Sequence, residues 1–322
     1  MSTAELGRVP FIPEATLRAH HVHELADDRF RAAARARQAL LREANGWPIG
    51  NWGADTDRPR EMGSYLSPEH AGANFITPEI AALARREVAW REDDALIDTD
   101  RLYRNMLSSM PAAFNLAGPL ALSPRLATAV LRRLAPDFVH KADATLFEHS
   151  PARRHPAFTN DRSAFDALFK VTTTSGELGF IAAEVKYTET CHEQPARLRP
   201  RYDELSRLST LFVDPDHPGL RVAPLQQLWR QHLLAFAMVH NGLYSAGRYF
   251  LVAPTLNRAV QDAVALYQTH LLPGGIIPFN VVSFEQFIEA IRRSGAKDIA
   301  ARLHERYLDF SPVDALITGP QS

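Results

Sequence analysis

The segment 164–189, AFDALFKVTTTSGELGFIAAEVKYTE, contains two apolar stretches separated by the turn TTTSGE. This pattern predicts two β-strands that form an antiparallel hairpin. Charged residues interrupt both strands, and three of them are Asp166, Glu184 and Lys186. A buried ion pair stabilises a protein poorly, because the cost of removing both charges from water largely cancels their attraction. Charges at these positions therefore favour a functional site over a structural ion cluster at the edge of a sheet.

The register of the hairpin decides whether the three charges meet. Glu184 and Lys186 share a face of the second strand because they are two residues apart. Asp166 joins them only if the numbers of paired residues add up to an even value: a sum of 350 sets it opposite Glu184, and a sum of 352 sets it opposite Lys186. An odd sum would send Glu184 to the other face. In the even registers the β-carbons lie within about 4.5–8 Å of each other, so both carboxylates could bind one cation.

Two neighbouring carboxylates in a partly dry cleft repel each other, so that one tends to take up a proton. A hard divalent cation removes this conflict, and Mg²⁺ prefers oxygen ligands while it retains several waters. We therefore expect Asp166 and Glu184 to bind Mg²⁺, or Mn²⁺ in its place, with the backbone carbonyl of Val185 as a third ligand. The ammonium of Lys186 could hold a water or offset charge that develops on a phosphate. Only four of the 36 basic residues are lysines, so a lysine here requires a reason.

The rest of the chain predicts an α/β protein. Residues 1–135 are expected to be mainly helical, with helices over 24–44, from Thr77, over 99–110 and from Ser123, and with an irregular segment over 46–76. From residue 136 onward we expect strands at 144–150, 162–171, 179–187, 248–254 and 277–283, and helices at 224–240, at 257–271 and from Ser283. No linker separates the helical region 1–135 from the domain 136–322, so the two could form one compact unit.

An Asp on one strand of a hairpin and Glu-x-Lys on the next resemble the signature of the PD-(D/E)XK nuclease superfamily. The order of elements over 144–254 is similar to the core of its restriction-endonuclease-like fold, a mixed β-sheet flanked by helices. In that superfamily the Asp and Glu hold Mg²⁺ and the Lys assists the water that attacks a phosphodiester, which implies these roles for Asp166, Glu184 and Lys186. The proline of the family name is absent, because Phe165 precedes Asp166, but that position is loose in the superfamily. The resemblance covers about 110 residues and leaves the helical first third outside.

The same resemblance implies further site residues. Many members add an acid from an upstream element, and Glu148 is the candidate, although an acid at a strand end often faces solvent. Some exonuclease-like members place a Gln on the helix after the Glu-x-Lys strand. Gln226 and Gln227 both qualify, and we assign Gln227 to the site. The alternative is that these residues form the polar edge of an amphipathic helix.

Several arginines are candidates for substrate binding. Arg230 lies one turn beyond Gln227 and could contact a phosphate. The loop SPARRHP contains two more, Arg153 and Arg154, which could grip a backbone phosphate or lie in an exposed turn. A row on the predicted helix 24–44 could also touch phosphates or simply be solvated, and it consists of Arg31, Arg35 and Arg42.

We therefore expect a Mg²⁺-dependent nuclease, a hydrolase of nucleic-acid phosphodiesters, with DNA favoured over RNA. The net charge of −1 argues against a globally basic nucleic-acid binder, but it does not exclude a local basic groove. The alternative is a catalytically inactive protein of the same fold that acts as a nucleic-acid-binding or scaffolding subunit. A weaker third hypothesis is a Schiff-base enzyme centred on Lys186.

Composition predicts a cytoplasmic protein without a membrane partner. The single cysteine, Cys191, excludes an internal disulfide and fits a reducing compartment. The N-terminal sequence MSTAELGRVPFIPEA lacks the features of a signal peptide, and no segment approaches the roughly 20 apolar residues of a membrane span. Oligomeric state is left open, a homo-oligomer included, as is the choice between endonuclease and exonuclease action.

Overall fold

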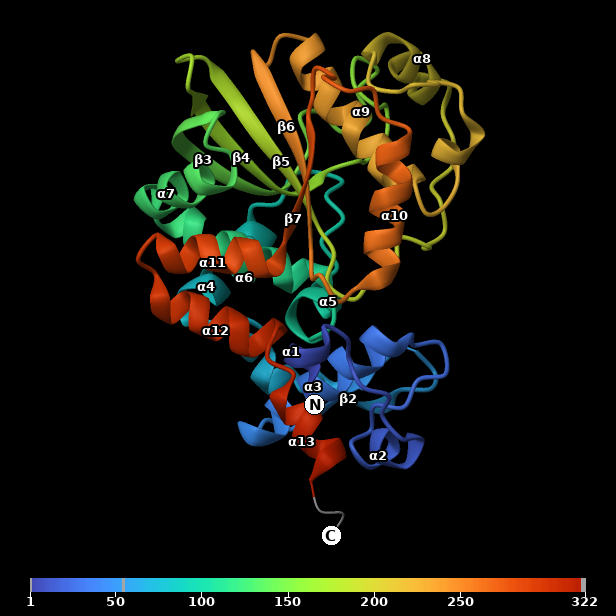
Figure 1. The fold of residues 1–322 in the computed structure, drawn as a ribbon, viewed down its shortest axis with the longest axis vertical. Helices are drawn as coiled ribbons and strands as arrows, with labels where there is room; N and C mark the ends of the chain where they lie inside the picture. The colour runs from blue at the N-terminus through green and yellow to red at the C-terminus, as the bar shows by residue number, and fades with distance from the viewer. Residues whose placement is uncertain (1, 54–55, 320–322) are drawn as a thin grey trace.

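The computed structural model describes residues 2–53 and 56–319. Its main sheet has five strands in the order β3-β4-β5-β6-β7 (Figure 1). The strands are β3 (Val139–His149), β4 (Phe165–Thr173), β5 (Leu178–Val185), β6 (Ala246–Ala253) and β7 (Phe279–Ser283). β3, β4 and β5 are antiparallel neighbours, whereas β6 runs parallel to β5 and β7 runs parallel to β6. The predicted mixed sheet of an α/β fold is confirmed.

The N-terminal region is mainly helical, as predicted. It contains α1 (Thr3–Leu6), α2 (Glu14–Ala19), α3 (Arg29–Ala44), the 3₁₀ helix η1 (Pro68–Asn74), α4 (Pro78–Ala89), α5 (Thr99–Tyr103), α6 (Ser109–Leu122) and α7 (Pro124–Leu134). Thr77 caps α4 by accepting a hydrogen bond from the backbone of Ile80, with Pro78 in the first turn, so this predicted helix start is confirmed.

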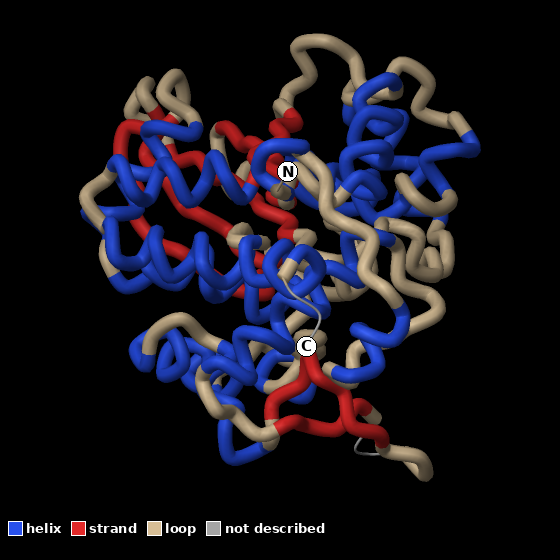
Figure 2. Tube along the Cα trace, turned by 60° about the horizontal axis from the view of Figure 1, so that its bottom comes forward, coloured by secondary structure: helices blue, strands red, loops and turns tan. Residues whose placement is uncertain are grey.

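The segment predicted to be irregular contains a small sheet, so that prediction is wrong. Strands β1 (Ile49–Trp52) and β2 (Arg60–Leu66) pair antiparallel, apart from the main sheet (Figure 2). Two glycines of this segment lie where backbones approach closely. A Cβ on Gly50 would lie 2.2 Å from the carbonyl oxygen of Leu66, and one on Gly63 would lie 2.2 Å from that of His20.

The helix predicted over 99–110 is two helices, α5 and α6. Between them Asn105 forms a β-bridge with Tyr65, and the backbone N–H of Met106 donates to the carbonyl of Ser64 at 3.0 Å. The side chain of Ser108 then caps α6. Pairing with β2, a partner distant in sequence, therefore interrupts the single helix that was predicted here. It also creates a helix start that proves important for the site.

The C-terminal part of the chain supplies helices to both faces of the main sheet. They are α8 (Pro200–Ser209), the 3₁₀ helix η2 (Pro218–Arg221), α9 (Gln226–His240), α10 (Arg258–Thr269), α11 (Phe284–Arg293), α12 (Lys297–Tyr307) and α13 (Ser311–Thr318). α9 and α10 lie on one face, whereas α6, α7 and α11 cover the other (Figure 1). The capping box that begins at Ser283 is confirmed. Helices α8, α12 and α13 were not predicted.

The helical region and the sheet share one hydrophobic core. Phe114 of α6 stacks on Phe147 of β3, with ring centroids 4.3 Å apart. Further buried residues of α3, α6, α7, β4, β5 and α11 belong to the same cluster. A second cluster, which includes Leu168, Phe180 and Trp229, fills the face under α9. We therefore propose that regions 1–135 and 136–322 form one compact unit.

Two arginines of the row on α3 are buried, which neither sequence interpretation expected. Arg35 donates to Asp27 at 2.6 Å and to the hydroxyl of Ser64 at 3.1 Å. Arg42 donates to the backbone carbonyl of Gly63 at 3.0 Å. These guanidinium groups hold β2 against α3 and do not face a substrate. Separately, none of the helices within residues 2–53 and 56–319 combines the length and the apolar character needed to cross a membrane.

Candidate active site

The register of β4 and β5 brings the two acids of the hairpin together. Ala167 pairs with Ala183 and Leu168 with Ala182, so the numbers of paired residues add up to 350. Of the two even registers, this is the one that sets Asp166 opposite Glu184. The backbone N–H of Val185 donates to Oδ2 of Asp166 at 2.7 Å and ties the two strand ends together.

Asp166, Glu184 and Lys186 line one cleft of about 500 Å³ beside α9. Only 4% of the side chain of Glu184 and 6% of that of Lys186 is exposed, so these two groups form its floor. Glu148 and Arg230 line the same cleft. A ligand must therefore enter the cleft to reach the charged groups of the hairpin.

A network of hydrogen bonds fixes the carboxylate of Glu184 and the ammonium of Lys186. Oε1 of Glu184 accepts a hydrogen bond from the amide of Gln227 at 2.7 Å, and Oε2 accepts one from Gln231 at 2.5 Å. Nζ of Lys186 lies 3.0 Å from Oε1 of Glu184 and donates to Oε1 of Gln227 at 2.7 Å. The hydroxyl of Tyr249 donates to Gln231 at 2.7 Å. Both charged groups are thus held by neutral amides from α9.

Two of the three glutamines at the start of α9 serve the charged centre. Gln227 lies where the sequence suggested, whereas the side chain of Gln226 turns away and bonds both backbone groups of Ala196. Sequence reasoning missed Gln231. A signal was available, because Gln231 follows Gln227 by four residues and therefore lies on the same helix face.

Glu148 reaches the cleft through an unusual backbone conformation. Its φ of +45° lies in the left-handed region, which costs a non-glycine residue about 1–3 kcal/mol. Burial, with further contributions from Glu184 and Glu92, raises the pKa of Glu148 to about 7, against the opposing effect of Arg153. Near neutral pH this carboxyl can therefore either hold or release a proton.

The pKa values of Asp166 and Lys186 are both shifted in the direction expected of a crowded acidic site. Burial, together with the nearby carboxylates of Glu184 and Glu148, raises the pKa of Asp166 well above its usual range. Burial alone would lower the pKa of Lys186, but the adjacent carboxylate of Glu184 outweighs it and raises that pKa. Lys186 therefore stays protonated, while the acids, if all were ionised, would carry more negative charge than the site accommodates easily.

This donor set fits a hard divalent cation. No group of three or more His, Cys, Asp and Glu side chains in the described part of the chain forms a complete metal site. Mg²⁺, however, is usually held by one or two carboxylates together with waters and substrate phosphates. No described residue donates to Oδ1 of Asp166, and Oε2 of Glu184 accepts a single hydrogen bond, so both keep lone pairs free. The role of the Val185 carbonyl as a third ligand stays a prediction.

The three candidate arginines are placed differently. Arg230 lines the cleft and donates to Asp161 and Ser163, both at 2.9 Å. Arg153 donates to the carbonyl of Glu148 at 2.6 Å and pairs with the carboxylate of Glu92, and it is not part of the cleft lining. Arg154 pairs with Asp94 at 2.9 Å and also lies outside the lining. Arg153 therefore supports the backbone of Glu148, and of these three arginines only Arg230 lines the cleft.

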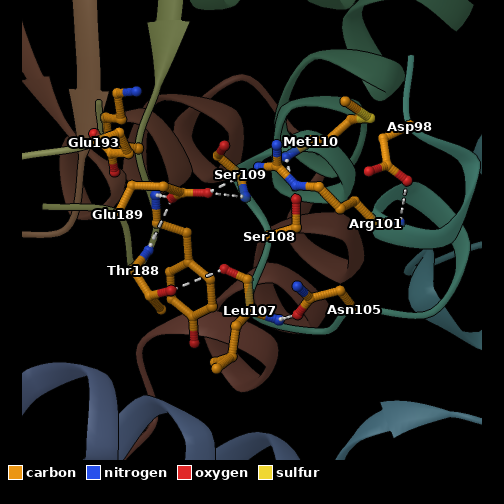
Figure 3. Close-up of polar contacts among 12 residues, drawn as sticks. Asp98, Arg101, Asn105, Leu107, Ser108, Ser109, Met110, Thr188, Glu189 and Glu193 are labelled. Carbon is orange, nitrogen blue, oxygen red and sulfur yellow. Dashed lines mark hydrogen bonds and ion pairs between the residues drawn. The ribbon is translucent and has the colours of Figure 1, made fainter. Parts of the chain in front are cut away.

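The helical region holds the segment that follows Lys186. Oε1 of Glu189 accepts a hydrogen bond from the backbone N–H of Ser109 at 2.9 Å, in the first turn of α6 (Figure 3). Thr188 donates through Oγ1 to the carbonyl of Leu107 at 3.0 Å (Figure 3). Burial disfavours the charge of Glu189, but Lys186 and Ser109 lower its pKa overall. The start of α6 thus fixes the chain three residues beyond the ammonium.

Glu148→Gln is expected to stabilise the metal-free protein at pH 8 by roughly 3 kcal/mol and to change little at pH 4. A group whose folded pKa is raised contributes stability below its unfolded value near 4.5, and this contribution is lost as the pH rises through about 7. The amide keeps the shape of the side chain and removes the charge. Denaturant unfolding in EDTA at both pH values measures the difference, and equal stability of the two proteins at pH 8 would contradict a buried, strained carboxylate at this position.

A family model described as the PD-(D/E)XK nuclease superfamily matches residues 25–309 of the chain. No curated protein and no solved structure gives a significant match. The matched range takes in the five-stranded sheet and most of the helical N-terminal region. The expectation that the helical first third lies outside the resemblance is therefore wrong from residue 25 onward.

Proposed function

Because the chain belongs to the PD-(D/E)XK nuclease superfamily, we propose that it hydrolyses nucleic-acid phosphodiester bonds with Mg²⁺ or Mn²⁺, and that DNA is favoured over RNA. One observation carries the proposal: the carboxylates of Asp166 and Glu184 and the ammonium of Lys186 converge in one cleft. The metal, when bound, would polarise the scissile phosphate and lower the pKa of the attacking water.

Each residue of the site has a distinct part in the proposed reaction. Asp166 and Glu184 hold the cation through the lone pairs that the network leaves free. Lys186 acts as a fixed positive charge and hydrogen-bond donor, because the carboxylate of Glu184 raises its pKa and favours the protonated Nζ. The amide of Gln227 directs Nζ, and Gln231 holds the second oxygen of Glu184. Glu148, with a pKa of about 7, can take up a proton from the attacking water at its carboxylate.

A second candidate is a protein of the same fold that binds or organises nucleic acid without cutting it. One observation favours it: Glu184 is hydrogen-bonded through both oxygens by protein groups alone, as in a structural ion pair. Such a protein would bind nucleic acid equally well in Mg²⁺ and in EDTA and would yield no product.

Digestion of labelled substrates by the wild-type protein tests the two candidates. We expect product from linear or single-stranded DNA with Mg²⁺ or Mn²⁺ and none in EDTA. Cleavage of a circular substrate separates endonuclease from exonuclease action, and a matched RNA tests the preference for DNA. Tight binding of every substrate without product under any metal condition would favour the second candidate and contradict the first.

A further inference from the structure

We propose that Arg197 and Arg199 form a site on the rim of the cleft for backbone phosphates of the bound nucleic acid, next to the scissile phosphate. This inference rests on the proposed function and names the chemistry by which the same cleft holds its substrate. Both residues line the cleft that contains Asp166 and Lys186. Both belong to the segment 194–199, which has no helix or strand, and Arg199 has an extended backbone with φ −126° and ψ 141°.

The two guanidinium groups are free to bind an anion. No described residue accepts a hydrogen bond or forms an ion pair with either side chain, and both residues are exposed. The other arginines of the cleft all have partners: Arg101 contacts Glu189, Arg162 pairs with Asp94, and Arg230 pairs with Asp161. Guanidinium binds phosphate through two parallel hydrogen bonds, so an unpaired arginine at this position suits a phosphodiester.

The spacing suits a chain of phosphates better than a single anion. Residues i and i+2 of a chain lie at most about 7 Å apart, because each residue adds no more than about 3.3–3.6 Å. That separation lets the arginines engage successive phosphates of one strand. Prolines lie on both sides of the two arginines, with Pro195 two residues before Arg197 and Pro200 directly after Arg199 at the start of α8, and they restrict the backbone there.

A buried glutamine fixes this segment to the helix that organises the charged centre. Oε1 of Gln226 accepts a hydrogen bond from the backbone N–H of Ala196 at 2.8 Å, and its Nε2 donates to the carbonyl of Ala196 at 2.6 Å. Gln226 is only 2% exposed. The next residue, Gln227, bonds Glu184 and Lys186. One turn of α9 therefore sets both the arginine rim and the floor of the cleft, which pre-organises a path for one strand.

Salt-dependent binding in EDTA tests the rim without any cleavage. The probe is a fluorescein-labelled single-stranded DNA of about 20 nucleotides, with its duplex as a second probe, and binding is measured by anisotropy. For Arg197→Ala/Arg199→Ala we expect roughly tenfold weaker binding of the single strand. We also expect the slope of log affinity against log salt to fall by about 1.4, since each lost phosphate contact to a single strand removes about 0.7.

Arg85→Ala/Arg125→Ala is the matched control. It removes the same charge from two exposed arginines that lie outside the cleft lining, and it should leave the slope unchanged. Gln226→Leu should weaken binding several-fold at an unchanged slope, because the charges remain but lose their fixed placement. An unchanged slope in the rim variant, an equal loss in the control, or no binding of either probe by wild type would overturn the proposal. Absence of cleavage with Mg²⁺ would instead count against nuclease activity alone.

Discussion

Lys186→Ala is expected to reduce the rate of phosphodiester cleavage by about three orders of magnitude, because a positioned cation at a reacting phosphate is worth about 10³–10⁵ in rate. Nζ of Lys186 is held in place by Glu184 and Gln227 at the floor of the cleft, so the charge that the variant removes has a fixed position. Single-turnover cleavage with saturating Mg²⁺ isolates the chemical step from substrate binding.

The same variant should also lose stability, by up to about 3 kcal/mol, because a buried carboxylate without its counter-charge is costly. Glu184 keeps its two amide donors, so the protein should still fold, and a thermal melt checks this before the assay. Lys170→Ala is the matched control, since Lys170 is a lysine of β4 that does not line the cleft. Cleavage by Lys186→Ala at the wild-type rate would contradict the assigned role. Trapping of a carbonyl substrate on Lys186 by borohydride, independent of metal, would favour the Schiff-base hypothesis instead.

The hairpin could be predicted because its information is local. Alternating side chains predict both strands, and parity alone restricts the registers that bring Asp166 and Glu184 together. The choice between the two even registers, in which the paired residue numbers add up to 350 or to 352, is not local. It depends on how the turn closes and on the parallel pairing of β5 with β6. The sequence therefore restricted the hairpin to the two registers that place Asp166 and Glu184 on one face, but it did not decide that the two residues lie directly opposite each other.

The roles of residues that act through tertiary contacts could not be predicted from the sequence. The cap of α6 exists because β2 pairs with residues far along the chain, and without that break Glu189 has no helix start to bind. The left-handed backbone of Glu148 is likewise imposed by its surroundings. The sequence gives no sign of it, because the residue with positive φ is not a glycine. Gln226 and Gln227 are neighbours about 100° apart around α9, so only the orientation of the helix against β5 decides which one serves the charged centre.

Asp166→Asn is expected to reduce cleavage by at least three orders of magnitude and to abolish the rise in melting temperature that we expect Mg²⁺ to produce in the wild type, because it removes one of the two proposed charged ligands. The amide oxygen can still accept the hydrogen bond from Val185, so the strand ends stay joined. In EDTA the variant should be at least as stable as the wild type above neutral pH. The raised pKa of Asp166 means that its contribution to stability is present at low pH and is lost as the pH rises through the folded value.

These opposed effects separate a metal ligand from a structural residue. Loss of a residue that merely holds the fold lowers stability with or without metal, whereas loss of a crowded acidic ligand lowers only the stability that metal supplies. Asp143→Asn is the matched control, because Asp143 is an exposed acid of β3 that pairs with Lys141 outside the cleft. It should keep both the cleavage rate and the response to Mg²⁺. If Asp166→Asn retained the full thermal response to Mg²⁺, the cation would bind elsewhere, and the assignment of the hairpin as a metal site would fail even if the protein cuts nucleic acid.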